Sequence, residues 1–151
     1  MDKLVIRVAE QNLTKIKELI NQGYDLNKPY NEHGWTPFTL AVAQKFQVSF
    51  INELIKLGGD INQPIKDGRT PLMLSCLSRK YPNALKLLIQ YGADVNAQDK
   101  NGYTALMQVL RLNDLSDKKA FIKTLIDNGA DLTKLKNIQG KTALDIILDR
   151  I

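Results

Sequence analysis

The stretch that decides the fold is residues 68–96, GRTPLMLSCLSRKYPNALKLLIQYGADVN, because two markers within it recur along the chain. The first marker is GRTPLMLSCL, and similar segments are GWTPFTLAVA from Gly34, GYTALMQVLR from Gly102 and GKTALDIILD from Gly140. The second marker is YGADVN, and similar segments are QGYDLN ending at Asn27, LGGDIN ending at Asn62 and NGADLT ending at Thr133. The opening glycines are 34, 34 and 38 residues apart. A nearly constant period of this length indicates a stack of repeated structural units.

The segment before each Gly-Asp marker has the periodicity of a helix. Three apolar residues at positions i, i+3 and i+4 lie on one stripe of a helix. These triplets are Ile16/Leu19/Ile20, Ile51/Leu54/Ile55, Leu85/Leu88/Ile89 and Ile122/Leu125/Ile126. The glycines that follow the triplets, Gly23, Gly58, Gly92 and Gly129, are placed where a helix ends in a left-handed residue.

The G-x-T marker predicts the start of another, shorter helix, which comes first in each repeat. Its threonine is a natural N-cap, because the hydroxyl can accept a hydrogen bond from a free backbone N–H. Pro37 and Pro71 follow at the first helical position, where a missing N–H costs nothing. Each repeat is therefore expected to contain a turn, a short helix, a loop, a second helix and an extended return.

These motifs resemble the ankyrin repeat, in which G-x-T-P-L-x-x-A is followed by L-L-x-x-G-A-D-V-N with a period of about 33 residues. The resemblance covers nearly the whole chain and implies an all-α solenoid of stacked helix pairs, with no sheet beyond short turn hairpins. We predict a single domain, residues 1–151. Its repeats are expected at about 1–30, without a leading turn, then 31–64, 65–98 and 99–136, with a C-terminal half repeat at 137–151.

Two departures from the family pattern carry structural expectations. The histidine common after T-P-L is replaced by Thr39, Met73, Met107 and Asp145, so the hydrogen bond that it usually supplies between repeats is not expected. The distance from turn glycine to Gly-Asp glycine is 24, 24 and 27 residues in the three full repeats. The third therefore has three extra residues around 112–117, where we expect Ser116, followed by Asp117, to cap the second helix.

Composition excludes several classes of protein. Hydrophobic residues make up 44% and charged residues 25%, as in soluble globular domains, and no apolar run is long enough to cross a bilayer. Met1 to Glu10 lacks the pattern of a signal peptide, so we expect a cytoplasmic protein with no membrane partner. The net charge of +5 comes largely from scattered lysines, which favours a solvated surface over a nucleic-acid site.

Motifs that could indicate chemistry have simpler interpretations. Gly140-Lys141-Thr142 lacks the glycine that a phosphate-binding loop requires five residues earlier, where Leu135 stands. The Asp-x-Asn of residues 94–96 resembles the start of a calcium loop but belongs to the repeat. The single cysteine, Cys76, is expected to be a small buried residue, and the single histidine, His33, lies at a turn tip. We therefore expect no enzyme, no cofactor and no metal site.

The resemblance implies a concave binding face. In ankyrin repeats this face is lined by the residue after each turn glycine, the two before it and the exposed end of the first helix. Carried over, these positions are Glu32, His33, Trp35 and Gln44, then Lys66, Asp67, Arg69 and Ser78, then Lys100, Asn101, Tyr103 and Arg111, then Ile138, Gln139 and Lys141. Trp, Arg and Tyr are enriched at the energetic centres of interfaces. The alternative is that Trp35 and Tyr103 only pack against the neighbouring turn.

The function expected from these features is binding of another protein by a monomer with a preformed groove. A second interpretation is a scaffold or cap that forms a homodimer through its C-terminal end, where we expect Ile147 and Ile151 to be exposed. The same features are also compatible with an inhibitor or immunity-type protein, with a secreted effector, and with an enzyme of an unrecognised kind. The identity of the partner is not encoded in the repeat frame, because fold alone does not specify function.

Overall fold

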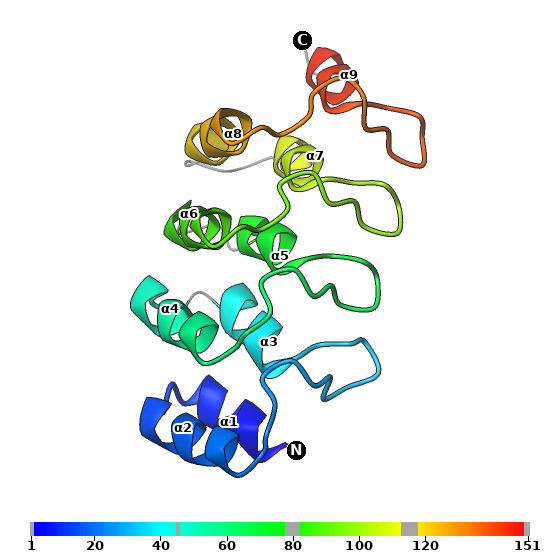
Figure 1. The fold of residues 1–151 in the computed structure, drawn as a ribbon. Helices are drawn as coiled ribbons and strands as arrows, with labels where there is room; N and C mark the ends of the chain where they lie inside the picture. Colours follow the sequence, from blue (N-terminus) through cyan, green and yellow to red (C-terminus); the bar gives the residue numbers. More distant parts are fainter. Residues whose placement is uncertain (1, 45, 78–81, 113–117, 150–151) are drawn as a thin grey trace.

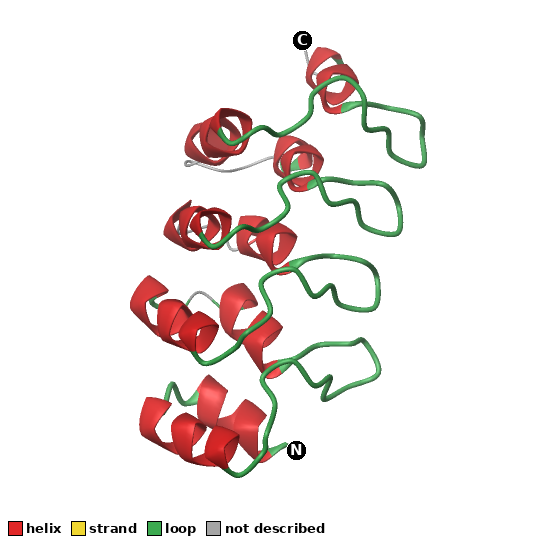
Figure 2. Ribbon diagram, viewed as in Figure 1, coloured by secondary structure: helices red, strands yellow, loops and turns green. Residues whose placement is uncertain are grey.

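The computed structural model describes residues 2–44, 46–77, 82–112 and 118–149, and nine α-helices lie in these ranges. The helices are α1 (Lys3–Ala9), α2 (Leu13–Asn21), α3 (Pro37–Ala43), α4 (Val48–Lys56), α5 (Pro71–Leu77), α6 (Pro82–Gln90), α7 (Ala105–Arg111), α8 (Lys118–Asp127) and α9 (Ala143–Leu148). These helices follow one another in pairs, ending with the single helix α9, and they stack along one axis with the two termini at opposite ends (Figure 1). No strand occurs in the described ranges (Figure 2), so the predicted all-α stack is confirmed.

The helices form two layers joined by a shared core. The first helices α1, α3, α5, α7 and α9 contact one another in succession, and α4, α6 and α8 do the same in the second layer. Large side chains from both layers are fully buried between them, among them Phe38 and Leu72 of the first layer and Leu54 and Leu88 of the second. Complete burial of one such side chain stabilises the fold by about 1.5–3 kcal/mol. The apolar stripe read from the sequence is therefore the surface on which the repeats stack.

Threonine side chains begin the first helices, as predicted. The hydroxyls of Thr36, Thr104 and Thr142 accept hydrogen bonds from the backbone N–H three residues later. Two residues that replace the family histidine complete this cap: the side chains of Thr39 and Asp145 each accept a hydrogen bond from the N-cap backbone N–H, at 2.8 Å. The departure from the family pattern is thus a capping box, which the sequence interpretation did not identify.

Asparagines, rather than histidines, connect successive repeats through side-chain hydrogen bonds. Asn96 Nδ2 donates to the carbonyl of Gly129 at 2.9 Å, and Asn96 Oδ1 accepts from the N–H of Asp131 at 2.8 Å. Asn27 and Asn62 make the same two contacts in the preceding repeats. The Asp-x-Asn motif is therefore a connector between repeats, and each amide satisfies two backbone groups of the following helix end.

Three expectations need correction or fall outside the described ranges. Ile126 is 40% exposed, and Phe121, not part of the predicted triplet, is fully buried in its place. The physical reason is that α8 contacts α7 and α6, with no following second helix within the described residues to cover Ile126. Ile147 is half-buried rather than exposed, whereas Leu144 and Leu148 are exposed. Residues 113–117, with the predicted cap at Ser116, and Ile151 lie outside the described residues.

Candidate binding groove along the fingers

Each turn between repeats forms a finger that projects beyond the first helices, on the right in Figure 1. In the second finger, the Ile65 N–H donates to the Arg69 carbonyl at 3.0 Å and closes the turn. The Asp67 carboxylate accepts a hydrogen bond from the Arg69 N–H at 3.1 Å, which fixes the tip. Such short polar side chains mimic a backbone turn by bonding to the chain two residues on. The fingers are therefore held by local bonds and not only by packing.

Backbone hydrogen bonds join the fingers into one row. The Lys66 N–H donates to the His33 carbonyl at 2.9 Å, the Lys100 N–H to the Asp67 carbonyl at 3.0 Å, and the Ile138 N–H to the Asn101 carbonyl at 2.8 Å. The turn glycines make this approach possible. Gly34 has φ +76°, and a Cβ there would lie 2.8 Å from the Lys66 nitrogen, too close for any other residue. The row is thus formed before any partner binds.

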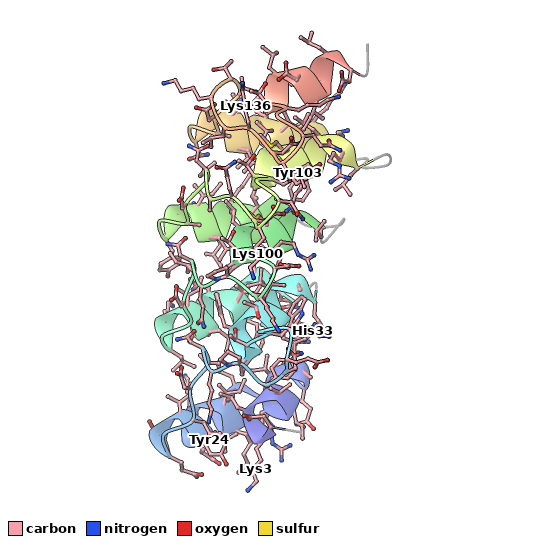
Figure 3. The ribbon with its side chains drawn as sticks, turned by 90° about the vertical axis from the view of Figure 1, so that its right-hand side faces the viewer. Lys3, Tyr24, His33, Lys100, Tyr103 and Lys136 are labelled. Atoms are coloured by element: carbon pink, nitrogen blue, oxygen red, sulfur yellow. The ribbon has the colours of Figure 1, made fainter. Side chains whose placement is uncertain are left out.

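Three cavities follow one another along this row, and we call them together the finger groove. Their volumes are about 370, 410 and 270 Å³. The first and second share Asp67 and Arg69 as lining residues, and the second and third share Tyr103 and Arg111. Figure 3, which views the molecule from the finger side, shows His33, Lys100 and Tyr103 in succession along the stack. The groove therefore runs along the stack from the first finger to α9.

Most of the predicted binding residues meet in the finger groove. Those that line it are His33, Trp35, Lys66, Asp67, Arg69, Lys100, Asn101, Tyr103, Arg111, Gln139 and Lys141. Glu32 and Gln44 are exposed but do not line these cavities, and Ile138 is 71% exposed outside them. Ser78 lies outside the described residues. The family positions therefore lie mostly on one surface, but Glu32, Gln44 and Ile138 lie outside its cavities.

The groove also contains residues that the sequence interpretation missed. Asp99 and Asn137 line it and stand three residues before a turn glycine, as Asn31 does in the first finger. Asp99 and Asn137 each accept backbone hydrogen bonds that shape their tip. This recurrence could have identified Asp99 and Asn137 from the sequence. Gln108 and Asp149 also line the groove, and no sequence signal distinguishes them from other exposed helix positions.

Tyr103 packs against the neighbouring finger, which is the alternative that the sequence left open for this residue. Only 9% of it is accessible, its hydroxyl lies 3.5 Å from Gln139 Oε1, and the Arg111 guanidinium stands 4.6 Å from the ring centroid. The neighbouring finger and the end of α7 cover the ring. Trp35 is half-buried and lines the first cavity beside Lys66. Of the two aromatics, Trp35 offers the larger exposed fraction to a partner.

Charges within the groove are only partly paired. Arg69 Nη2 lies 2.7 Å from Asp67 Oδ2, and Lys141 forms an ion pair with Asp149. Burial raises the pKa of Asp67, but hydrogen bonds from Arg69 outweigh it and hold the pKa below its usual value. The hydrogen bond to Asp149 raises the pKa of Lys141. Asp67 and Lys141 are therefore ionised at neutral pH, and each is neutralised by its own partner.

Two buried amide atoms at the groove lack hydrogen-bond partners within the described residues. They are Gln108 Oε1 and Asn137 Nδ2. Asn137 is 6% exposed, and its Oδ1 already accepts from the N–H groups of Gln139 and Lys141. A buried polar atom without a partner is uncommon in folded proteins.

The residues considered for chemistry lie in unrelated environments. Cys76 is fully buried in α5, and burial raises the pKa of its thiol to about 12, so it stays protonated. His33 is an exposed finger residue whose Nε2 lies 3.7 Å from Glu32. No group of three His, Cys, Asp or Glu residues with metal-binding geometry occurs in the part of the chain that the structure describes. Within the same part, no helix is both long and apolar enough to span a bilayer.

Comparison with known proteins agrees with this architecture. A family model of ankyrin repeats, containing three copies, matches residues 4–99 and 78–148. Repeats of this family generally mediate protein–protein interaction and are generally non-catalytic. A 2-5A-dependent ribonuclease of Mus musculus is 33% identical over 72 residues, which are 48% of this chain and 10% of the ribonuclease. Since the family model covers most of the chain, this protein belongs to the ankyrin-repeat family.

Proposed function

We propose that this protein binds a partner protein in the finger groove and carries no catalytic site of its own. The observation that carries the proposal is the convergence of the predicted binding positions on three connected cavities. The groove is built on a row of fingers that are bonded to one another through the backbone. Because a preformed surface loses little conformational freedom on binding, more of its contact energy becomes affinity.

Within this proposal, residues of the first two cavities supply most of the binding energy. Trp35 supplies a half-buried aromatic surface, and Arg69 is held in place by its ion pair with Asp67. Residues of these two types dominate the binding energy of many interfaces when a partner excludes water from them. Tyr103, because it is buried, contributes mainly by shaping the groove and positioning Arg111.

The test is affinity capture from the native organism with wild type, followed by affinity measurements on the captured partner. Replacing Trp35 or Arg69 with Ala should weaken binding by about 1–4 kcal/mol each. Outer-face lysines on the second helices serve as controls, namely Lys17, Lys56, Lys86 and Lys123, and replacing them should change affinity little. If the outer lysines are critical and Trp35 is neutral, the binding surface is the opposite face and the assignment fails.

We also propose that the free protein is a monomer. The rival is a homodimer formed through the C-terminal end, where Leu144 and Leu148 are exposed. Size-exclusion chromatography with light scattering decides between them. A mass of twice 17.0 kDa that falls to the monomer mass in a Leu144→Gln/Leu148→Gln variant would support the rival.

A second candidate is a small phosphorylated ligand in the first cavity. The name of the mouse relative ties that enzyme to 2-5A, although the match covers only 10% of it. In this chain, Trp35, Lys66 and Lys100 line one cavity of about 370 Å³. An aromatic face beside cations is the arrangement on which bases stack and phosphates bind. A titration with 2-5A, followed by the emission of Trp35, would show saturable binding that is lost in Lys66→Gln if this candidate is correct.

A further inference from the structure

The cations of the finger groove differ in whether the chain already neutralises them. Arg69 is paired with Asp67, and Lys141 with Asp149. Lys66 and Lys100 are exposed, and neither side chain has a hydrogen-bond or ion-pair partner within the described residues. They occupy the same position in successive fingers, two residues before the turn glycine. Both lysines therefore line one cavity together with Trp35, and their charges are available to an incoming anion.

The two carboxylates adjacent to these lysines in the chain, Asp67 and Asp99, already bind other groups. Asp99 Oδ1 accepts from the N–H groups of Asn101 and Tyr103, both at 2.9 Å, and Asp99 Oδ2 accepts from Gln108 Nε2 at 3.1 Å. Asp67 bonds to the backbone and to the guanidinium of Arg69. Because these bonds shape the finger tips, turning either carboxylate toward Lys66 or Lys100 would sacrifice them. Lys66 and Lys100 therefore have no ion-pair partner because the adjacent carboxylates are used to shape the finger tips.

We propose that the partner presents an acidic polypeptide segment to the finger groove, with carboxylates at Lys66 and Lys100 and an apolar side chain against Trp35. This inference rests on the proposed function and specifies the chemistry of the partner. Opposite charges at an interface favour the right partner and accelerate its encounter, because the field attracts it before contact. The adjoining cavity adds Arg111, which lines it over the ring of Tyr103.

A polypeptide fits the groove better than a nucleic acid because the groove is not uniformly positive. Asp67, Asp99 and Asp149 line it between the cations. A nucleic-acid backbone carries one charge at every unit, so part of it would face these carboxylates. The guanidinium of Arg69, whose fork suits phosphate, is already bound to Asp67. A polypeptide, in contrast, can have carboxylates opposite the lysines and uncharged residues opposite the aspartates.

The experiment selects displayed random peptides on the wild-type protein and measures the affinity of the recovered peptides. Trp35 is the only tryptophan, so its emission reports occupation of the groove directly. The variant Lys66→Gln/Lys100→Gln removes the two free charges. Lys17→Gln/Lys86→Gln is the matched control, because it removes the same charge from exposed positions on α2 and α6.

The expected result is enrichment of Asp and Glu in the selected peptides, with a change in Trp35 emission on binding. The groove variant should bind them roughly tenfold more weakly, and the control variant should bind as wild type does. Affinity should also fall as salt is raised, because exposed charges are screened. Tighter binding of a single-stranded thymidine oligonucleotide than of any selected peptide would overturn the polypeptide assignment.

The outcomes separate this inference from the proposed function. Peptides without acidic enrichment that still lose affinity in Trp35→Ala would overturn the acidic chemistry and leave groove binding intact. Peptides that bind without changing Trp35 emission, and equally to every variant, would overturn both. Recovery of no peptide would also count against the inference, because an acidic segment of any sequence should be retained weakly by the two lysines.

Discussion

At the scale of single residues, the burial of Tyr103 separates stability from binding. The ring is held between the end of α7 and the neighbouring finger, with Arg111 over its face. Truncation therefore leaves a cavity, whereas an exposed aromatic could be removed at little cost. A binding defect measured in a Tyr103 variant must be corrected for loss of folded protein before it is assigned to the interface.

We expect Tyr103→Ala to lower the free energy of unfolding by about 2–4 kcal/mol, because it empties the space filled by the buried ring. Tyr103→Phe keeps the ring and removes only the long hydrogen bond to Gln139, so it should cost about 0.5 kcal/mol or less. Urea unfolding followed by circular dichroism measures both. A small cost for the alanine variant would show that the ring is at the surface after all.

The connecting asparagines give a second prediction at this scale. Asn96→Ala removes two hydrogen bonds to the next repeat and should lower the free energy of unfolding by about 1–2 kcal/mol. Thr133 occupies the same repeat position, but its hydroxyl has no hydrogen-bond partner within the described residues. Thr133→Ala is therefore the matched control and should be nearly neutral. Equal effects of the two substitutions in urea unfolding would contradict the role of the asparagine.

At the scale of the element, α9 depends on its cap more than any inner helix does. It is six residues long, contacts α7, and begins with the reciprocal hydrogen bonds between Thr142 and Asp145. So short a helix has little stability of its own, because nucleation is costly and few backbone bonds repay it. The charge of Asp145 adds a favourable interaction with the positive end of the helix.

This arrangement predicts a specific dependence on pH. Hydrogen bonds from the backbone and the side chain of Thr142 lower the pKa of Asp145 from 3.8. Since the folded pKa is the lower one, the stability it contributes is fully present above about pH 4 and is lost as pH falls through the folded pKa. Asp145→Asn should therefore flatten the fall in melting temperature as the pH is lowered below about 4. An unchanged slope would mean that the cap does not contribute.

At the scale of the whole molecule, stability varies along the stack because inner repeats are covered on both sides. Helices α3, α5 and α7 each contact first helices on either side, whereas α9 contacts α7 alone in that layer. In a linear stack, stability is approximately a sum of repeat terms and of interfaces between neighbours. Within the described residues α9 therefore has one first helix as a neighbour instead of two, and Leu144 and Leu148 are exposed.

We therefore expect residues 99–149 to open before the centre of the stack. Hydrogen exchange should show faster exchange of backbone amides in α8 and α9 than in α5 and α6, because local opening precedes global unfolding where contacts are fewest. The longer connection at 112–117 lies in this part of the chain. Uniform protection from α2 to α9 would contradict the prediction.

Much of this protein could be predicted from its sequence because the deciding signals are local. The period of the two markers, the threonine caps and the glycine helix ends depend on neighbouring residues in the chain. The structure confirms the all-α stack, the caps at Thr36, Thr104 and Thr142, and the buried Cys76. Local hydrogen bonding and helical periodicity fix such features whatever the partner helix is.

Burial was decided only by the tertiary structure, because it depends on contacts with neighbouring elements of the stack. Neighbouring elements bury Tyr103 and Phe121 but leave Ile126 exposed. The repeat frame left the burial of Tyr103 open and did not predict the other two outcomes. Charge pairing depends on the folded conformation of each finger and helix: Arg69 binds Asp67 and Lys141 binds Asp149, whereas Lys66 and Lys100 have no carboxylate partner within the described residues. Side-chain exposure is a property of packed surfaces, and the spacing of residues along the chain does not contain it.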